Sequence, residues 1–229
     1  MPNSYAISWD DTGERYYELG VKHGVLFPRT GANGAYAAGV AWNGLTGVTE
    51  SPSGADANDL WADNMKYATL RSVETFGGTI EAFTYPEEFE QCDGSASLAT
   101  GVYAGQQSRV PFGFSYITNI GDDTESDAEN DNGYKIHLVY GATVNPSQRS
   151  YATINDSPDA ITFSWEFTTT PIAVEGKKPI AHIVIDSRTV DATKLGTFKQ
   201  ILYGTPAAGS TAAVDPRLPL PDEVITHFA

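Results

Sequence analysis

The sequence predicts an all-β protein, a sandwich or barrel-like fold with one flanking α-helix and a short second helix. Apolar and polar residues alternate with a period of two in several segments, and glycine- and proline-rich turns separate these segments. Aromatic residues make up 11% of the chain and charged residues 19%, a composition typical of a β-rich globular protein rather than a disordered one. At 229 residues, the chain fits a single all-β domain over residues 1–229.

The strands are expected where the alternation is strongest. Phe163, Trp165 and Phe167 alternate with polar residues, and Ile136 and Leu138 lie in a second segment of the same kind. Alternate side chains point to one face of a strand, so these patterns predict strands that are half buried. Further strands are expected at residues 17–27, 36–42, 65–71, 79–85, 112–116 and 181–185.

Two helices follow from capping and periodicity. Asp191 is a suitable N-cap for a helix with one apolar stripe that ends at Gly204. The stripe consists of Leu195, Phe198, Ile201 and Leu202. Residues 86–92 predict a short helix of about two turns that starts with a proline. A last turn or two after Pro221 is expected to be either docked or free.

Three segments lack a regular pattern. Residues 44–64 predict a long projecting loop, and a loop of such length is usually functional or mobile. Residues 121–132 contain six acids and no base. Residues 205–221, within a C-terminal extension over 205–229, form a linker rich in proline, alanine and glycine that is expected to run extended. None of these segments requires a domain boundary.

Charge and cysteine content exclude several classes of function. The chain has 14 Lys and Arg against 29 Asp and Glu, a net charge of −15, which argues against nonspecific binding to nucleic acid. The lone Cys92 excludes an intramolecular disulfide and a zinc site built on paired thiolates. No apolar run is long enough to span a membrane, and the first residues have no leader pattern. We expect a soluble protein made in the cytoplasm, without a membrane partner.

No catalytic residue, cofactor or metal site is expected. The four histidines are scattered, and the zincin, serine-hydrolase and P-loop motifs are absent from the sequence. His137 and His182 each lie in a predicted strand opposite its apolar stripe, which favours surface or structural histidines. The acids Asp127, Glu129 and Asp131 alternate as in a calcium loop, but the following glycine and glutamate positions do not fit. A solvated acidic loop is favoured there.

The aromatic residues leave a carbohydrate-binding module open as an alternative. Tyrosine and tryptophan at strand spacing can form a sugar-binding platform, although residues in this pattern more often lie in a core. A sandwich fold alone does not decide between these functions.

Several segments of the chain resemble the major tail proteins, or tail tube proteins, of long-tailed bacteriophages with non-contractile tails. The resemblance spans most of the chain, and none of its segments is a catalytic signature. The segments are YELGV at 17–21, VLFP at 25–28, GVAWNGL at 39–45, WADNMKY at 61–67, GGTIEAFTYPEEF at 77–89, GYKIHLVYGA at 133–142 and ITFSWEF at 161–167.

The resemblance implies a non-enzymatic virion protein, a β-sandwich with a flanking helix. Six copies close into a ring, and stacked rings form the tube through which the genome passes. The implied partners are other copies of the chain and the tape measure, tail tip and tail terminator proteins, with phage DNA passing through without specific binding. The implied location is the virion tail, after synthesis and assembly in the bacterial cytoplasm. An added immunoglobulin-like domain is not expected, and a tail terminator is a further alternative.

Two sets of residues are expected to serve this role. The long segment is the first candidate for ring stacking, through Pro52, Asp59, Leu60, Trp61, Asp63 and Asn64, and the C-terminal linker is the second. The wall of the lumen is expected to be acidic, because acidic groups repel DNA within a Debye length of about 8 Å. Glu81 and Glu166, on the polar faces of two predicted strands, are candidate lumen residues, and residues 122–131 are expected on the lumen or, more favourably, the exterior.

Overall fold

The structure, a computed structural model, describes residues 7, 9–30, 35–124, 132–154, 156, 159–209 and 212–229. It confirms the all-β class with a flanking helix and a short second helix, and this second helix is the C-terminal one rather than the one expected at residues 86–92. The strands are β1 (Tyr17–Thr30), β2 (Ala35–Tyr36), β3 (Val40–Trp42), β4 (Leu45–Glu50), β5 (Ala57–Ala62), β6 (Met65–Arg71), β7 (Gly77–Ala82), β8 (Ala96–Ala99), β9 (Val102–Ala104), β10 (Phe112–Gly121), β11 (Tyr134–Val144), β12 (Phe163–Thr169) and β13 (His182–Asp186). The helices are a 3₁₀ turn at Glu87–Phe89, α1 (Ala192–Tyr203) and α2 (Pro221–Phe228).

The body of the protein is one antiparallel sheet that folds over itself. Its strand order is β2-β1-β10-β11-β12-β7-β4, with β3 paired to β1 and β13 paired to β11. The long strand β11 changes partner along its length, pairing with β13 through residues 135–139 and with β12 through residues 142–144. This change of partner divides the sheet into two halves that face each other.

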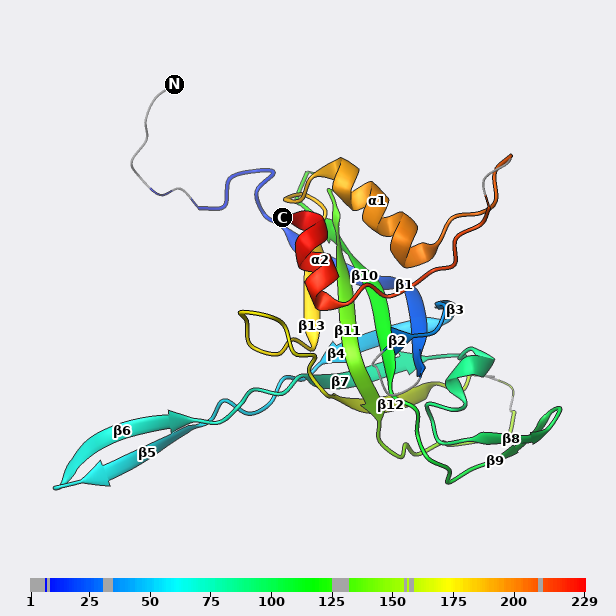
Figure 1. Ribbon diagram of the computed structural model, residues 1–229, viewed down its shortest axis with the longest axis horizontal. Coiled ribbons are helices and arrows are strands. Elements are labelled where there is room, and N and C mark those ends of the chain that lie inside the picture. The colour runs from blue at the N-terminus through cyan, green and yellow to red at the C-terminus, as the bar shows by residue number, and fades with distance from the viewer. Residues whose placement is uncertain are drawn as a thin grey trace.

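Two apolar clusters form the core. The first lies between the two halves of the sheet and is rich in aromatic rings, among them Trp42, Phe89 and Trp165. The second lies on the other side of β10 and β11, where α1 and α2 cover the sheet (Figure 1). The central strand β11 is therefore buried on both faces, with Ile136 and Leu138 in one cluster and Val139 in the other.

The flanking helix forms as its sequence predicts. The Asp191 carboxylate accepts a hydrogen bond from the Lys194 backbone N–H at 2.9 Å, which caps the first turn. Leu195, Phe198 and Leu202 are buried against the sheet, and Gly204 follows the last turn with φ at +74°. Asp191 and the apolar stripe together explain why residues 192–203 are helical.

The C-terminal extension is docked on the body. Leu218 is buried, and the Tyr140 hydroxyl donates a hydrogen bond to the Pro219 carbonyl at 2.9 Å. Helix α2 follows and packs beside α1, with Val224 buried. Of the two outcomes left open for this segment, the docked one is confirmed.

Residues 86–92 do not form the two-turn helix that the proline and acids predict. Only Glu87–Phe89 make a 3₁₀ turn, and the chain then turns again up to Gly94, whose φ is +85°. Phe89 and Cys92 are both fully buried, so the segment is shaped by inserting these two side chains into the core. Tertiary packing overrides the local helix signal at this point.

Candidate functional sites: a projecting arm and a histidine–glutamate cluster

A long arm projects from the body between β4 and β7. We define the arm as residues 51–76, and its outer part is the hairpin of β5 and β6, which extends well beyond the rest of the molecule (Figure 1). Ala57 pairs with Arg71 at one end of the hairpin and Ala62 pairs with Met65 at the other. The arm is thus an ordered two-stranded ribbon.

The tip of the arm is a tight turn. Asp63 and Asn64 have φ values of +52° and +62°, the left-handed conformation that a two-residue type I′ hairpin turn requires at both central positions. Aspartate and asparagine tolerate this conformation better than most other residues, so the dipeptide explains why the chain reverses here.

The root of the arm is tied together by hydrogen bonds. The Ser51 backbone N–H donates to the Gly77 carbonyl at 2.8 Å, and Ser53 pairs with Thr75 in an isolated bridge. The hydroxyls of Ser53 and Thr75 are 2.9 Å apart. The two legs of the arm therefore leave the sheet side by side.

Large apolar side chains are exposed along the arm. Trp61 is 69% exposed and Tyr67 is 75% exposed, and no residue of 51–75 belongs to either core cluster. The other exposed large apolar residues of the arm are Leu60, Met65, Leu70 and Val73. Exposed apolar patches are a common feature of interaction sites, so the arm is a candidate contact surface.

The structure corrects the predicted secondary structure of this region. Residues 44–64 are not a loop: residues 45–50 form β4 at the end of the sheet, and residues 57–62 form β5. Residues 65–71 do form a strand, but in the arm and not in the body. Of the predicted stacking residues, Pro52 lies at the root, Asp59, Leu60 and Trp61 lie in β5, and Asp63 and Asn64 form the tip. Trp61 shares a face of the hairpin with Asp59, Lys66 and Thr69, whereas Leu60, Met65 and Leu70 lie on the other face, so both faces of the arm expose apolar side chains.

The two candidate lumen acids share one face of the sheet. Glu81 on β7 lies opposite Ser164, and Glu166 on β12 lies opposite Thr79, so both side chains point away from the aromatic core. Both residues are exposed. Strands β4, β7 and β12 contain no lysine or arginine, so the residues of these three strands contribute only negative charge to this face.

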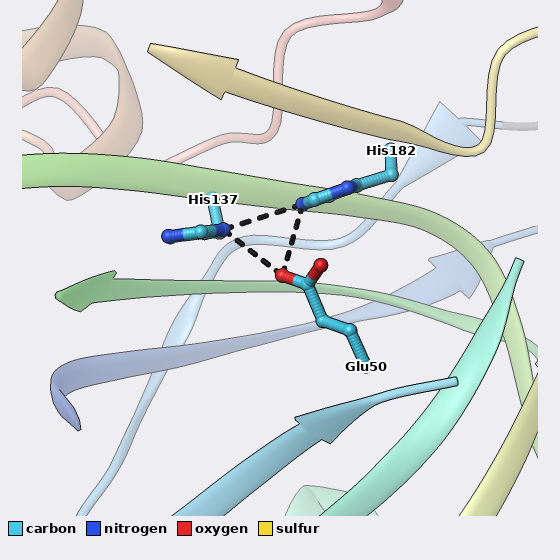
Figure 2. Close-up of side chains that lie close together, drawn as sticks. All are labelled: Glu50, His137 and His182. Atoms are coloured by element: carbon cyan, nitrogen blue, oxygen red, sulfur yellow. Dashed lines mark hydrogen bonds and ion pairs between the residues drawn. The ribbon is translucent and has the colours of Figure 1, made fainter. Parts of the chain in front are cut away.

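A second site brings together three residues that are distant in the sequence. Glu50 ends β4, His137 lies within β11, and His182 begins β13 (Figure 2). Glu50 Oε1 is 3.2 Å from His137 Nδ1 and 3.5 Å from His182 Nε2, and these two nitrogens are 3.3 Å apart. We call these residues the His–Glu cluster. Both histidine side chains are largely buried, whereas the Glu50 side chain is 36% exposed.

Strand pairing explains why the two histidines meet. His182 lies opposite Val139 and His137 lies opposite Val184, which makes the histidines diagonal neighbours on one face of the β11–β13 pair. The Phe76 ring stacks on His182 with ring centroids 4.4 Å apart, and the Tyr116 ring stacks on His137 at 4.5 Å. The two imidazoles are thus held in place by aromatic rings.

Hydrogen bonds and burial set the ionisation states of Glu50 and His182. The Tyr116 hydroxyl donates to Glu50 Oε1 at 2.6 Å, and burial, together with this carboxylate, raises the pKa of Tyr116. The hydrogen bond from His137 is the main cause that lowers the pKa of Glu50 to about 2, with burial acting in the opposite direction. Burial lowers the pKa of His182. At neutral pH, Glu50 is therefore a carboxylate and His182 is a neutral imidazole.

Acidification is expected to destabilise the protein through this cluster. A group whose pKa is depressed by folding contributes stability above its unfolded pKa and loses that contribution as the pH falls through the folded value. For Glu50 this window runs from about pH 4.5 to about pH 2. We expect Glu50→Gln to destabilise the protein less at about pH 3 than at neutral pH, measured by urea unfolding with EDTA present. An equal loss of unfolding free energy at both pH values would contradict the assignment.

No sequence pattern predicts this cluster. Residues 50, 137 and 182 have no spacing that marks a shared site, and the alternation in β11 placed His137 on the face opposite the apolar stripe. That face is also buried, because the second half of the sheet covers it, and His137 is only 7% exposed. One signal that His137 is buried was present in the sequence: the strand over residues 134–144 has apolar residues on both of its faces, which is typical of a central strand.

Other predicted features have mixed outcomes. Cys92 is buried as expected, and burial with the nearby Asp93 raises the pKa of its thiol to about 12. Asp127, Glu129 and Asp131, considered as a calcium loop, lie outside the described residues. Neither α1 nor α2, the α-helices of the described chain, has the length and hydropathy needed to cross a membrane.

Comparison with known proteins gave no assignment. No protein-family model matches the chain, and no curated protein matches it.

Proposed function

We propose that the protein is a structural, non-enzymatic subunit that assembles with copies of itself into stacked rings, as the tail tube protein of a long-tailed bacteriophage or prophage. The observation that carries this proposal is the arm, an ordered ribbon with exposed apolar side chains and no core of its own. The resemblance of the sequence to tail tube proteins supplies the kind of assembly, a ring of six subunits stacked into a tube.

The arm supports assembly because it is poorly stabilised without a partner. A two-stranded hairpin is marginally stable in water, and the side chains of β5 and β6 are almost all exposed. If Trp61 buries most of its exposed surface, about 150 Å² of apolar area, contact with a neighbour stabilises the assembly by roughly 4 kcal/mol. A stacking contact between rings fits an element that reaches this far from the body (Figure 1).

The edges of the sheet support ring closure. Strand β4 is the last strand on one side of the sheet and β2 is the last on the other. Edge strands carry unpaired backbone groups that bind a further strand, and a head-to-tail contact between two different surfaces closes into a ring. Because β4 also leads into the arm, one element would connect the ring contact with the stacking contact.

The charge of the protein supports a tube that DNA traverses. Six subunits of charge −15 give a ring of −90, and such a surface does not retain phosphate. The exposed face of β4, β7 and β12, with Glu81 and Glu166, is our candidate for the lumen wall. Like charges also oppose assembly, so apolar and backbone contacts must outweigh this repulsion.

Electron microscopy of the purified protein tests the proposal. We expect six-fold rings or hollow tubes in negative stain, with assembly favoured as salt rises, because salt screens the repulsion between acidic subunits. Single rings that never stack would favour a tail terminator. Monomers at every concentration and salt would contradict self-assembly, and binding of glycans by those monomers would favour the carbohydrate-binding module.

A further inference from the structure

The geometry points to a divalent metal site at the root of the arm, in which Glu50 Oε1, His137 Nδ1 and His182 Nε2 bind Zn²⁺ or a similar first-row transition metal ion. This inference is independent of the proposed tube, because metal binding is a property of the single subunit.

The distances within the His–Glu cluster match one face of a tetrahedral zinc site. With metal–ligand bonds of about 2.0–2.1 Å, two ligand atoms of a tetrahedral site are separated by about 3.3 Å. The three separations in the cluster are 3.2, 3.3 and 3.5 Å. A metal ion about 0.7 Å out of the plane of the three atoms would reach all of them at normal bond lengths. Figure 2 shows the three side chains converging on one point from three strands.

The residue types select the metal. Two imidazoles and one carboxylate suit zinc and neighbouring transition metals, whereas calcium and magnesium prefer oxygen ligands only. Three protein ligands leave the fourth position for water. The Glu50 side chain is 36% exposed, so solvent reaches the cluster from its side.

The surroundings orient His137 as a ligand. Thr118 Oγ1 lies 3.1 Å from His137 Nε2 and donates its own proton to Glu18 Oε2 at 3.3 Å. In the metal-free cluster His137 Nδ1 donates to the Glu50 carboxylate. A bound metal would select the other tautomer, in which Nε2–H donates to the Thr118 hydroxyl and the Nδ1 lone pair binds the ion. Glu18 is in turn paired with Lys135. A hydrogen bond from the distal nitrogen of a histidine to a polar group is a regular feature of metal sites.

The position of the cluster gives the metal a structural role. Glu50 is the last residue before the arm, and Phe76, which stacks on His182, is the last residue of the arm. A metal ion would therefore join the first leg of the arm, through Glu50, to β11 and β13, and the second leg would contact the site through the stacking of Phe76 on the ligand His182. We expect the bound metal to hold the arm in one orientation by fixing its root.

The test uses the purified full chain, stripped of metal with EDTA and dialysed. We expect calorimetric titration with Zn²⁺ to give one site per chain, and a rise in melting temperature of about 5–10 °C at a 100-fold excess over Kd. His137→Gln and His182→Gln are each expected to weaken Zn²⁺ binding by 10-fold to 100-fold or more. His23→Gln, which changes an exposed histidine outside the cluster, is the matched control.

Two further readouts separate a metal site from a merely structural cluster. Co²⁺ in place of Zn²⁺ is expected to give the intense visible absorption of a four-coordinate ion, and Glu50→Gln is expected to weaken it. Zn²⁺ is also expected to slow hydrogen exchange at the backbone amides of Ser51, Ser53 and Thr75, which hold the root together. Absence of Zn²⁺ and Co²⁺ binding by the folded protein, or binding that survives both histidine substitutions, would overturn the inference. Either result would leave the assembly proposal to be judged by microscopy alone.

Discussion

Shortening the arm is expected to abolish tube formation and leave a folded subunit. Asn58 pairs with Leu70 in the hairpin, so residues 59–69 can be removed and these two residues joined by Asn-Gly, the preferred two-residue hairpin turn. No residue of the deleted segment belongs to either core cluster. The expected result is a melting temperature close to that of the unmodified protein, with tubes absent by electron microscopy under conditions in which the unmodified protein polymerises.

A single substitution tests the role of the arm with less disturbance. Trp61→Ala removes the largest exposed side chain of the arm. Aromatic residues at the centre of an interface typically contribute about 2 kcal/mol or more, so the concentration needed for assembly is expected to rise roughly 30-fold or more. The control is Leu98→Ser, because Leu98 is 72% exposed outside the arm, on the separate two-stranded sheet of β8 and β9. For the deletion of residues 59–69 described above, tubes of normal length would exclude the arm as the stacking element.

The arm also shows what a strand pattern can and cannot predict. Met65 and Tyr67 alternate with Lys66 and Ala68 in the way that half-buried strands do, and the segment is indeed a strand. The alternation reports that one face of the strand is apolar, but not which molecule covers that face. A strand that is covered by another copy of the chain has the same pattern as one that is covered by its own core.

The body of the fold was more predictable, because its signals are local. Trp165 and Phe167 are buried while Ser164 and Glu166 are exposed, as the period of two requires. Asp191 caps α1 as its residue type predicts. Residues 86–92 followed their local signal less well, since burial of Phe89 and Cys92 decided the path of the chain there.

The His–Glu cluster could not be predicted for a different reason. Its three residues come from β4, β11 and β13, and they meet only because β11 pairs with β13 and the sheet folds over so that the end of β4 reaches the same point. Sequence motifs for metal sites depend on short spacings within one helix, loop or hairpin. A site assembled by the topology of a folded sheet carries no such spacing.

The largest effect on stability is expected at Trp165. Its side chain is 1% exposed, and its ring lies 5.1 Å from Phe89, 5.4 Å from Tyr85 and 5.7 Å from Trp42. These contacts join β12 to β3 and to the segment around the 3₁₀ turn, so the ring sits at the centre of the first core cluster. Replacing a buried tryptophan with alanine destabilises a protein by about 3–5 kcal/mol, through lost burial and the cavity left behind.

For a chain of this length, that loss lowers the melting temperature by roughly 6–20 °C. Thermal and urea unfolding of Trp165→Ala, at a concentration where the protein is monomeric, measures the effect. Trp61→Ala is the internal comparison, because the same chemical change on the exposed arm is expected to alter the unfolding free energy by less than about 0.5 kcal/mol. The two substitutions are thus expected to affect different properties. Trp165→Ala reduces the stability of the subunit, whereas Trp61→Ala reduces assembly and leaves the subunit stable. Equal destabilisation by the two substitutions would mean that the arm packs against the body in solution, and the assignment of its apolar surface to a neighbouring subunit would then be wrong.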